Sequence, residues 1–186
     1  PASIVSLVKL KSLHLKYNQI ASLPSKFGNL VNLEELDLEG NRLSALPDSL
    51  SKLQKLKKLY INRNQFSKLP ECIQGMLTIE ELFSNANNLT ECAEVAHLTR
   101  LRMLNLASNQ LKKLPKGLKN LSLLRDLDVS SNKFNGTLPK EVGFLTDLVW
   151  FYLYDNQFTG MIPPDVGNLK YLSALLLSSN NFTGAL

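Results

Sequence analysis

The chain of 186 residues has few of the side chains that metal binding, redox chemistry or catalysis require. It contains two cysteines, two histidines and one tryptophan. Neither His14 nor His97 has a second histidine or a cysteine near it at a repeating position, so the sequence predicts no metal site. A phosphate-binding glycine loop, a nucleophile motif and paired inward acids are all missing. We therefore expect no cofactor, no catalytic residue and no enzymatic activity in this chain.

Long apolar runs and a strong excess of one charge are also missing. No stretch is long enough to span a membrane, so we expect no membrane insertion by this segment. The net charge of +5 is moderate. The basic residues alternate with acids, and no aromatic platform runs alongside them, which argues against a nucleic-acid partner.

What the chain has in abundance is leucine at a fixed spacing. Residues 33–53 read LEELDLEGNRLSALPDSLSKL, and the rest of the chain repeats this unit. The asparagine of the unit recurs at steps of 23, 23, 23, 22, 23, 24 and 24 residues. Its positions are Asn18, Asn41, Asn64, Asn87, Asn109, Asn132, Asn156 and Asn180.

The unit combines a short strand with a returning segment. Leu36, Asp37 and Leu38 alternate as in a strand, with the two leucines on one side. Stacked copies would form a parallel sheet whose inward leucines build one continuous core. The asparagine amide can both donate and accept, so we expect it to satisfy buried backbone groups at the turn. Pro47 suits the start of a helical turn or an extended segment on the far side.

The motif L-x-x-L-x-L-x-x-N-x-L at this period resembles the leucine-rich repeat family. The resemblance implies an α/β solenoid, a right-handed horseshoe with a parallel sheet on its concave face and short helical or extended segments on its convex face. It covers residues 1–186, which we interpret as a single domain of about eight repeats. Residues 1–10 and 180–186 match half-repeats, so we expect a piece of a longer array whose uncapped ends associate end to end.

Two subtypes share the array. Residues 10–123 resemble the 23-residue L-P type found in intracellular signalling scaffolds. From residue 124 the units read N-x-F-[TN]-G-x-[IL]-P and resemble the plant-specific type, common in receptor-kinase ectodomains and polygalacturonase inhibitors. That resemblance implies an extra short strand just after Gly136, Gly160 and Gly184.

The compartment stays open between cytoplasmic and extracellular. Four N-glycosylation sequons favour an extracellular location, and the missing cysteine caps favour the cytoplasm. The sequons begin at Asn88, Asn120, Asn135 and Asn181.

The repeat at residues 79–100 is irregular. Ser84 replaces the second strand leucine, the proline is absent and the repeat is one residue shorter. We interpret it as a tolerated defect in preference to a hinge or a partner-binding notch. Cys92 aligns with core leucines and is predicted to be a buried free thiol, whereas Cys72 falls at a position expected to be exposed. A disulfide between them is the less favoured alternative.

The solvent side of the strands is where the repeats differ. Charge sign alternates between neighbouring strands, which predicts cross-strand pairing. The strand near residue 150 places Phe151 and Leu153 inward and its aromatic neighbours outward. We predict a partner-binding site with an aromatic centre and charged edges, formed by Trp150, Tyr152, Tyr154, Asp128, Asp155 and Arg125. The alternative is that these aromatics only stabilise the sheet, since single aromatics at Tyr60 and Phe83 occur elsewhere on the face.

The pattern therefore favours non-catalytic recognition of a protein or peptide by the concave face. One alternative is the ectodomain of a receptor kinase or a secreted inhibitor of a cell-wall-degrading enzyme. Another is a repeat array attached to a catalytic domain outside this sequence.

Overall fold

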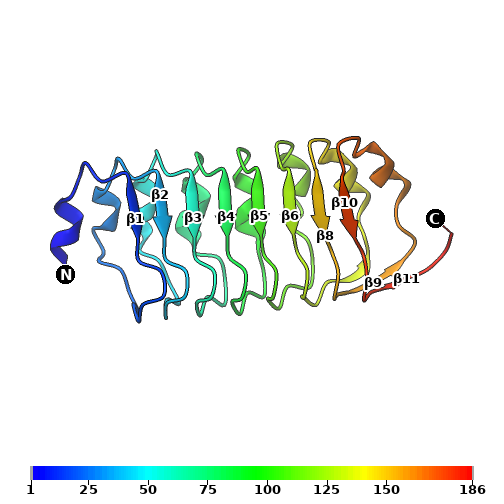
Figure 1. The fold of residues 1–186 in the computed structure, drawn as a ribbon, viewed down its shortest axis with the longest axis horizontal. Helices are drawn as coiled ribbons and strands as arrows, with labels where there is room; N and C mark the ends of the chain where they lie inside the picture. Colours follow the sequence, from blue (N-terminus) through cyan, green and yellow to red (C-terminus); the bar gives the residue numbers. More distant parts are fainter. Residues whose placement is uncertain (1, 186) are drawn as a thin grey trace.

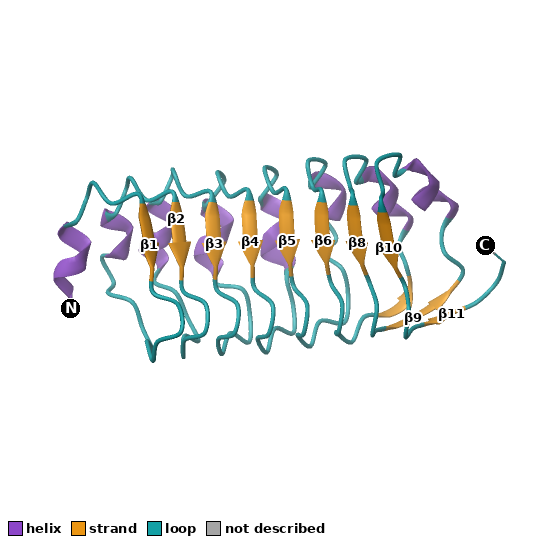
Figure 2. Ribbon diagram, viewed as in Figure 1, coloured by secondary structure: helices purple, strands orange, loops and turns teal. Residues whose placement is uncertain are grey.

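The computed structural model describes residues 2–185, which wind into a row of coils (Figure 1). Each coil contributes a short strand to one long face and returns along the opposite face, mostly through a 3-10 turn (Figure 2). Strands in a sheet lie about 4.8 Å apart, closer than helical segments can pack, so the strand side is the inner, concave side of a curved array. The predicted solenoid and its division into a strand face and a turn face are confirmed.

Eight three-residue strands form the parallel main sheet in the order β1-β2-β3-β4-β5-β6-β8-β10. Each pairs with the next at a matched position, so that Leu36 lies between Leu13 and Leu59. The strands are β1 Ser12–His14, β2 Glu35–Asp37, β3 Lys58–Tyr60, β4 Glu81–Phe83, β5 Met103–Asn105, β6 Asp126–Asp128, β8 Trp150–Tyr152 and β10 Ala174–Leu176.

The opposite face consists of 3-10 turns. Pro47 is extended, with φ −69° and ψ 142°, and directly precedes the turn Asp48–Lys52. Pro70, Pro139 and Pro163 take the same place before their turns. The turns are η1 Ala2–Ser6, η2 Phe27–Asn29, η3 Asp48–Lys52, η4 Glu71–Gly75, η5 Ala93–His97, η6 Leu118–Asn120, η7 Lys140–Phe144 and η8 Pro164–Asn168.

The C-terminal repeats carry a second, three-stranded sheet in the order β11-β9-β7, which confirms the extra strands. Their position differs from the prediction, since they do not follow the glycines. β7 (Asn135–Thr137) contains Gly136, β9 (Gln157–Gly160) ends at its glycine, and β11 (Asn181–Phe182) precedes Gly184. Phe134, Phe158 and Phe182 stack behind this sheet with centroids 5.7 and 5.9 Å apart, so the phenylalanine of the motif gives each extra strand its own core contact.

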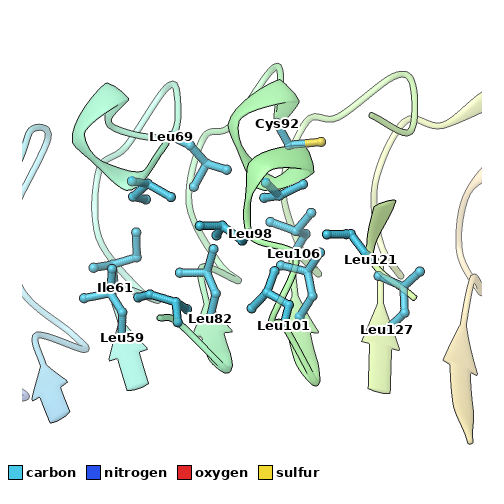
Figure 3. Close-up of a cluster of buried hydrophobic side chains, with 14 of the residues drawn as sticks. Leu59, Ile61, Leu69, Leu82, Cys92, Leu98, Leu101, Leu106, Leu121 and Leu127 are labelled. Atoms are coloured by element: carbon cyan, nitrogen blue, oxygen red, sulfur yellow. The ribbon is translucent and has the colours of Figure 1, made fainter. Parts of the chain in front are cut away.

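The core is a continuous column of leucines between the two faces. Leu59, Leu82 and Leu127 extend from the strands towards Leu98 and Leu121 on the turn side (Figure 3). All five are at most 1% exposed. Burying a leucine side chain contributes about 1.5–3 kcal/mol, so this column is the main source of stability.

Both cysteines are buried free thiols. Cys92 lies in the core as predicted (Figure 3), and its burial raises the pKa of its thiol to about 12. The exposed position predicted for Cys72 is wrong, because its residue is 6% exposed and burial raises its pKa to about 11. The equivalent Ser49 accepts a hydrogen bond from the Gly28 amide of the preceding turn, so this position faces a neighbouring repeat and not solvent.

The asparagines link consecutive repeats through backbone groups. The Asn64 amide nitrogen lies 3.0–3.2 Å from the carbonyl oxygens of Leu38, Ile61 and Asn62, and its oxygen accepts the amide of Leu43 at 2.9 Å. Asn41, Asn87, Asn109 and Asn132 repeat the arrangement. The structural role expected for the asparagines is confirmed.

The residue before each asparagine has a left-handed backbone. Gly40 has φ +65°, and the equivalent residues Tyr17, Arg63, Ala86, Ser108, Ser131, Asp155 and Ser179 have φ between +50° and +56°. This conformation costs about 1–2 kcal/mol for a residue with a side chain. Each described repeat therefore has a strained residue before its asparagine, except the repeat that has Gly40 there. This strain opposes folding, and the hydrogen bonds of the asparagine favour it.

The irregular repeat has two consequences. Ser84 is completely buried at a position that Ile61, Leu106 and Val129 occupy in other repeats, and its hydroxyl has no hydrogen-bond partner among the described residues. On the far side, a hollow of about 550 Å³ opens between η5 and the segment leading to η6. Its lining includes Cys92, Ala96, Lys113, Pro115 and Lys116.

The first and last coils bury their leucines less completely than the middle coils. Leu13, Leu15, Leu175 and Leu177 are only partly buried, whereas Leu36 and Leu59 are fully buried. β1 and β10 are the edges of the main sheet. End-to-end association of this chain stays a prediction.

Ser84→Ala should raise the free energy of unfolding by about 1 kcal/mol, because an unpaired buried hydroxyl costs about 1–3 kcal/mol. Ser130→Ala is the matched control, since Ser130 is equally buried but its hydroxyl donates to Asp128 Oδ1 at 2.6 Å. The control should lower stability by about 1 kcal/mol or more. Thermal denaturation of both variants checks this, and equal destabilisation would show that the Ser84 hydroxyl is satisfied.

Gly40→Ala should destabilise the chain by about 1–2 kcal/mol, because alanine disfavours the left-handed region. The new Cβ would also lie 2.5 Å from the Tyr17 ring. Ala86→Gly, the reverse exchange at the equivalent position of another repeat, should not lower stability. Urea titration measures both, and a comparable loss in both variants would contradict a backbone origin of the effect.

Candidate functional site

Charged residues on the first half of the sheet face pair across strands, as predicted. Lys58 lies 3.1 Å from Glu81, and Arg63 lies 3.4 Å from Glu39. Glu34 is placed between Lys11 and Lys57, at 3.5 and 3.8 Å, and Asp37 is contacted by His14 and Lys16. Exposed pairs of this kind contribute little each, but they leave this half of the face with its charges matched.

The aromatic rings of Tyr60 and Phe83 also pack against each other. Their rings stack with centroids 5.1 Å apart, so these are a cross-strand pair and not the single aromatics expected from the sequence. The Tyr60 hydroxyl donates to Glu81 Oε2 at 3.1 Å. Burial, with the nearby Glu81 carboxylate, raises the pKa of Tyr60 well above its usual range. This pair is explained by sheet stability alone.

The aromatics of β8 are arranged differently. Phe151 and Leu153 are fully buried, as the alternation predicted, while Trp150 is 43% exposed and Tyr152 and Tyr154 are half-buried. None of these three rings stacks on another ring among residues 2–185. Trp150 and Tyr152 are the first and last residues of β8, and Tyr154 lies in the loop after it. We call Trp150, Tyr152 and Tyr154 the aromatic strip.

The register of the sheet places small and apolar residues of β10 on one side of the strip and acids of β6 on the other. Trp150 is paired with Ala174 and Asp126, and Tyr152 with Leu176 and Asp128. Leu176 is 38% exposed and widens the apolar surface. Sequence reasoning missed Leu176, because it lies in a run of three leucines that hides the alternation. Sequence reasoning also did not assign Asp126 to the site, although its register with Trp150 could have been counted from the repeat.

Asp128 has a local structural role in addition to its place beside Tyr152. Its Oδ1 accepts the Ser130 amide at 3.0 Å and the Ser130 hydroxyl, and Asn105 donates weakly to its Oδ2 at 3.4 Å. Asn105 and Asp37 accept the amide two residues on in the same way. An asparagine at this position can therefore keep the contact with the backbone amide.

Arg125 and Asp155 lie at opposite ends of the strip. The Arg125 carbonyl accepts the amides of Val149 and Trp150, and its side chain lines a hollow of about 430 Å³ with Asp147, Val149 and Tyr171. Asp155 lies in the exposed left-handed turn below the strand. Five residues of nearly extended chain span about 16 Å, so the six predicted residues form an elongated band instead of a compact pocket.

The acids beside the strip are not neutralised like those of the first half. Within the described part of the chain, Asp126, Asp128 and Asp155 have no cationic side chain within 4.0 Å. Burial, and secondarily the charge of Asp128, raise the pKa of Asp126. The band therefore combines carboxylates that lack a cationic partner among residues 2–185 with one exposed and two half-buried aromatic rings.

Other kinds of site are not indicated in residues 2–185. These residues contain no group of three or more histidine, cysteine or acidic side chains placed to hold a metal ion. None of their helical segments has the length and apolar character needed to cross a membrane. The four sequon asparagines are all exposed.

Comparison with known proteins agrees with the repeat pattern. The family profile described as leucine-rich repeat region matches residues 2–104 and 83–183. Comparison with curated protein sequences gives no significant match. Among solved structures, a leucine-rich repeat protein of Leptospira interrogans is 35% identical with a TM-score of 0.94, over 100% of this chain and 47% of that one.

Two plant receptors are also similar. The ectodomain of the Arabidopsis receptor kinase HAESA, in complex with an N-terminally extended IDA peptide hormone, is 34% identical (TM-score 0.89), covering 100% of this chain and 33% of that one. The ectodomain of the Arabidopsis thaliana receptor kinase GASSHO1, in complex with CASPARIAN STRIP INTEGRITY FACTOR 2, is 32% identical. Its TM-score is 0.87, and the match covers 98% of this chain and 23% of that one. The chain spans less than half of each of these proteins. Its repeat motif, its sheet of parallel strands and the matched profile agree that this chain belongs to the leucine-rich repeat family.

Proposed function

We propose that this chain is a non-catalytic recognition module that binds a protein or peptide on its concave sheet face, at the aromatic strip. The observation that carries the proposal is the contrast between two sets of aromatics on one sheet. Tyr60 and Phe83 stack on each other, whereas Trp150 and Tyr152 have no ring partner among residues 2–185, and Trp150 is exposed to solvent.

The composition and shape of the strip support this role. Tryptophan and tyrosine are enriched among the residues that dominate binding energy, where truncation costs about 2 kcal/mol or more. A short parallel sheet holds the backbone of the strip rigid on both sides, through β6 and β10. Rigid aromatic anchors lose little conformational entropy on binding, so they suit a recognition surface.

A second candidate is that the chain is a segment of a peptide-binding receptor ectodomain. The similarity to the ectodomains of two receptor kinases favours it, HAESA in complex with a peptide hormone and GASSHO1 in complex with CASPARIAN STRIP INTEGRITY FACTOR 2. The extra sheet β11-β9-β7 is the structural counterpart of the plant-type motif. The reading frame around residues 1–186 tests this candidate, since a signal peptide, a membrane helix and a kinase domain would support it and their absence from the complete frame would contradict it.

Trp150→Ala and Tyr152→Ala should weaken peptide binding at least tenfold, because each removes an anchor of the strip. Peptides would be selected from a random 12-residue phage library on the immobilised chain, and their affinities measured by calorimetry. Both positions are on the solvent side of the sheet, so the melting temperatures should change by only a few degrees.

Phe144→Ala is the matched control, because Phe144 is an aromatic 58% exposed on the turn face in η7. It should leave the affinities unchanged. If the strip variants bind peptides as tightly as the parent chain does, or if they unfold, the aromatic strip only stabilises the sheet and the proposal is wrong.

A further inference from the structure

The aromatic strip is bordered by carboxylates that have no cationic partner within residues 2–185, and this charge pattern points to the chemistry of its occupant. Resting on the proposed function, we infer that the strip binds a cationic peptide segment, with an arginine side chain of the peptide placed over Trp150 and between Asp126 and Asp128. The docking surface is the strip with Leu176, and the charge of its border selects the partner.

The first step is the contrast in charge along one face. Glu34, Glu80 and Glu81 in the first half each have a lysine or arginine within 4.0 Å. Asp126 and Asp128 have no cation that near among residues 2–185. Arg125, the basic residue directly before Asp126, lines the hollow near Trp150 together with Asp147, Val149 and Tyr171. A cation supplied by a partner would give these two acids the kind of ion pair that the acids of the first half form within the chain.

The second step is the geometry of the border. Asp126 lies directly across from Trp150, and Asp128 from Tyr152, at the spacing of adjacent strands, about 4.8 Å. The two aspartates are two residues apart on one strand, so they face the same side about 7 Å apart. A cation above the ring of Trp150 or of Tyr152 is therefore within reach of the carboxylate directly across from that ring.

The third step is the choice of arginine. A guanidinium group is planar, stacks on an aromatic face and donates through a fork that matches a carboxylate. A lysine ammonium makes only the point-charge part of this contact. The site can therefore distinguish the two, and arginine should bind more tightly.

General charge attraction does not produce this preference. The chain carries a net charge of +5, so a polycation is repelled by the molecule as a whole. Binding of an arginine peptide would have to come from a local surface of opposite sign.

The test uses the single tryptophan, because Trp150 is the only one in the chain and its fluorescence reports on the strip directly. Hexaarginine, hexalysine and hexaglutamate peptides with blocked ends would be titrated into the intact chain. We expect a saturable change in emission with hexaarginine, a weaker one with hexalysine and none with hexaglutamate. The affinity for hexaarginine should fall as salt is raised.

The variants Asp126→Asn and Asp128→Asn, alone and combined, remove charge with little change of shape. An asparagine at position 128 can keep the backbone contact that Asn105 makes at the equivalent position, and it loses only the weak 3.4 Å contact from Asn105. Burial raises the pKa of Asp126, so its ionised form disfavours the fold. Both exchanges should therefore change the melting temperature by only a few degrees at neutral pH. The double variant should weaken hexaarginine binding at least tenfold. Glu34→Gln, which removes an acid that already has lysine partners, should leave it unchanged.

The outcomes separate this inference from the proposed function. Equal binding of hexaarginine by the double variant, or binding of hexaglutamate to the strip, would overturn the cationic preference. Library-selected peptides without arginine that still require Trp150 would overturn it too, and would leave peptide recognition intact. Selected peptides whose affinity does not change in the Trp150→Ala variant would contradict both the cationic preference and the proposed function.

Discussion

The structure depends on one side-chain amide, repeated once per coil. In the middle repeats, each asparagine donates to carbonyls of its own turn and of the preceding repeat, and accepts a backbone amide from that repeat. Asn64 and Asn109 are buried where the chain leaves the strand, a place where water cannot satisfy these groups. An unsatisfied backbone group there would cost about 1–3 kcal/mol, so the asparagine permits the tight turn that the leucine column needs.

The same arrangement explains why the backbone before the asparagine tolerates strain. Residues as different as Tyr17, Ala86 and Asp155 all have a left-handed conformation that favours glycine. Their side chains are free to vary because the conformation is imposed by the bonds of the next residue and by the register of the sheet. The left-handed turn and the sheet face are therefore places where sequence can change without loss of the fold, and the proposed binding site is on the sheet face.

The two halves of the sheet face use this freedom differently. In the first half, charges and rings meet partners on neighbouring strands, as with Lys58 and Glu81 or Tyr60 and Phe83. In the second half, Trp150 lies beside Asp126 and Ala174, and neither neighbour stacks on its ring. Charges and rings of the first half are therefore matched within the sheet, whereas the ring of Trp150 and the carboxylate of Asp126 have no such match among residues 2–185.

The sequence by itself determined the fold, because a period of 22 to 24 residues with inward leucines permits only a stacked parallel sheet. It also determined which side chains of β8 face outward, since alternation along a strand is local geometry. It did not determine the burial of Cys72, the extent of β7 and β9, or the exposure of Leu176, because these depend on contact with neighbouring coils. Whether a ring or a charge has a partner is likewise a relation between strands 21 to 24 residues apart. Only the tertiary structure decided that Tyr60 is paired and that, within residues 2–185, Trp150 has no stacking partner and Asp126 no counter-ion.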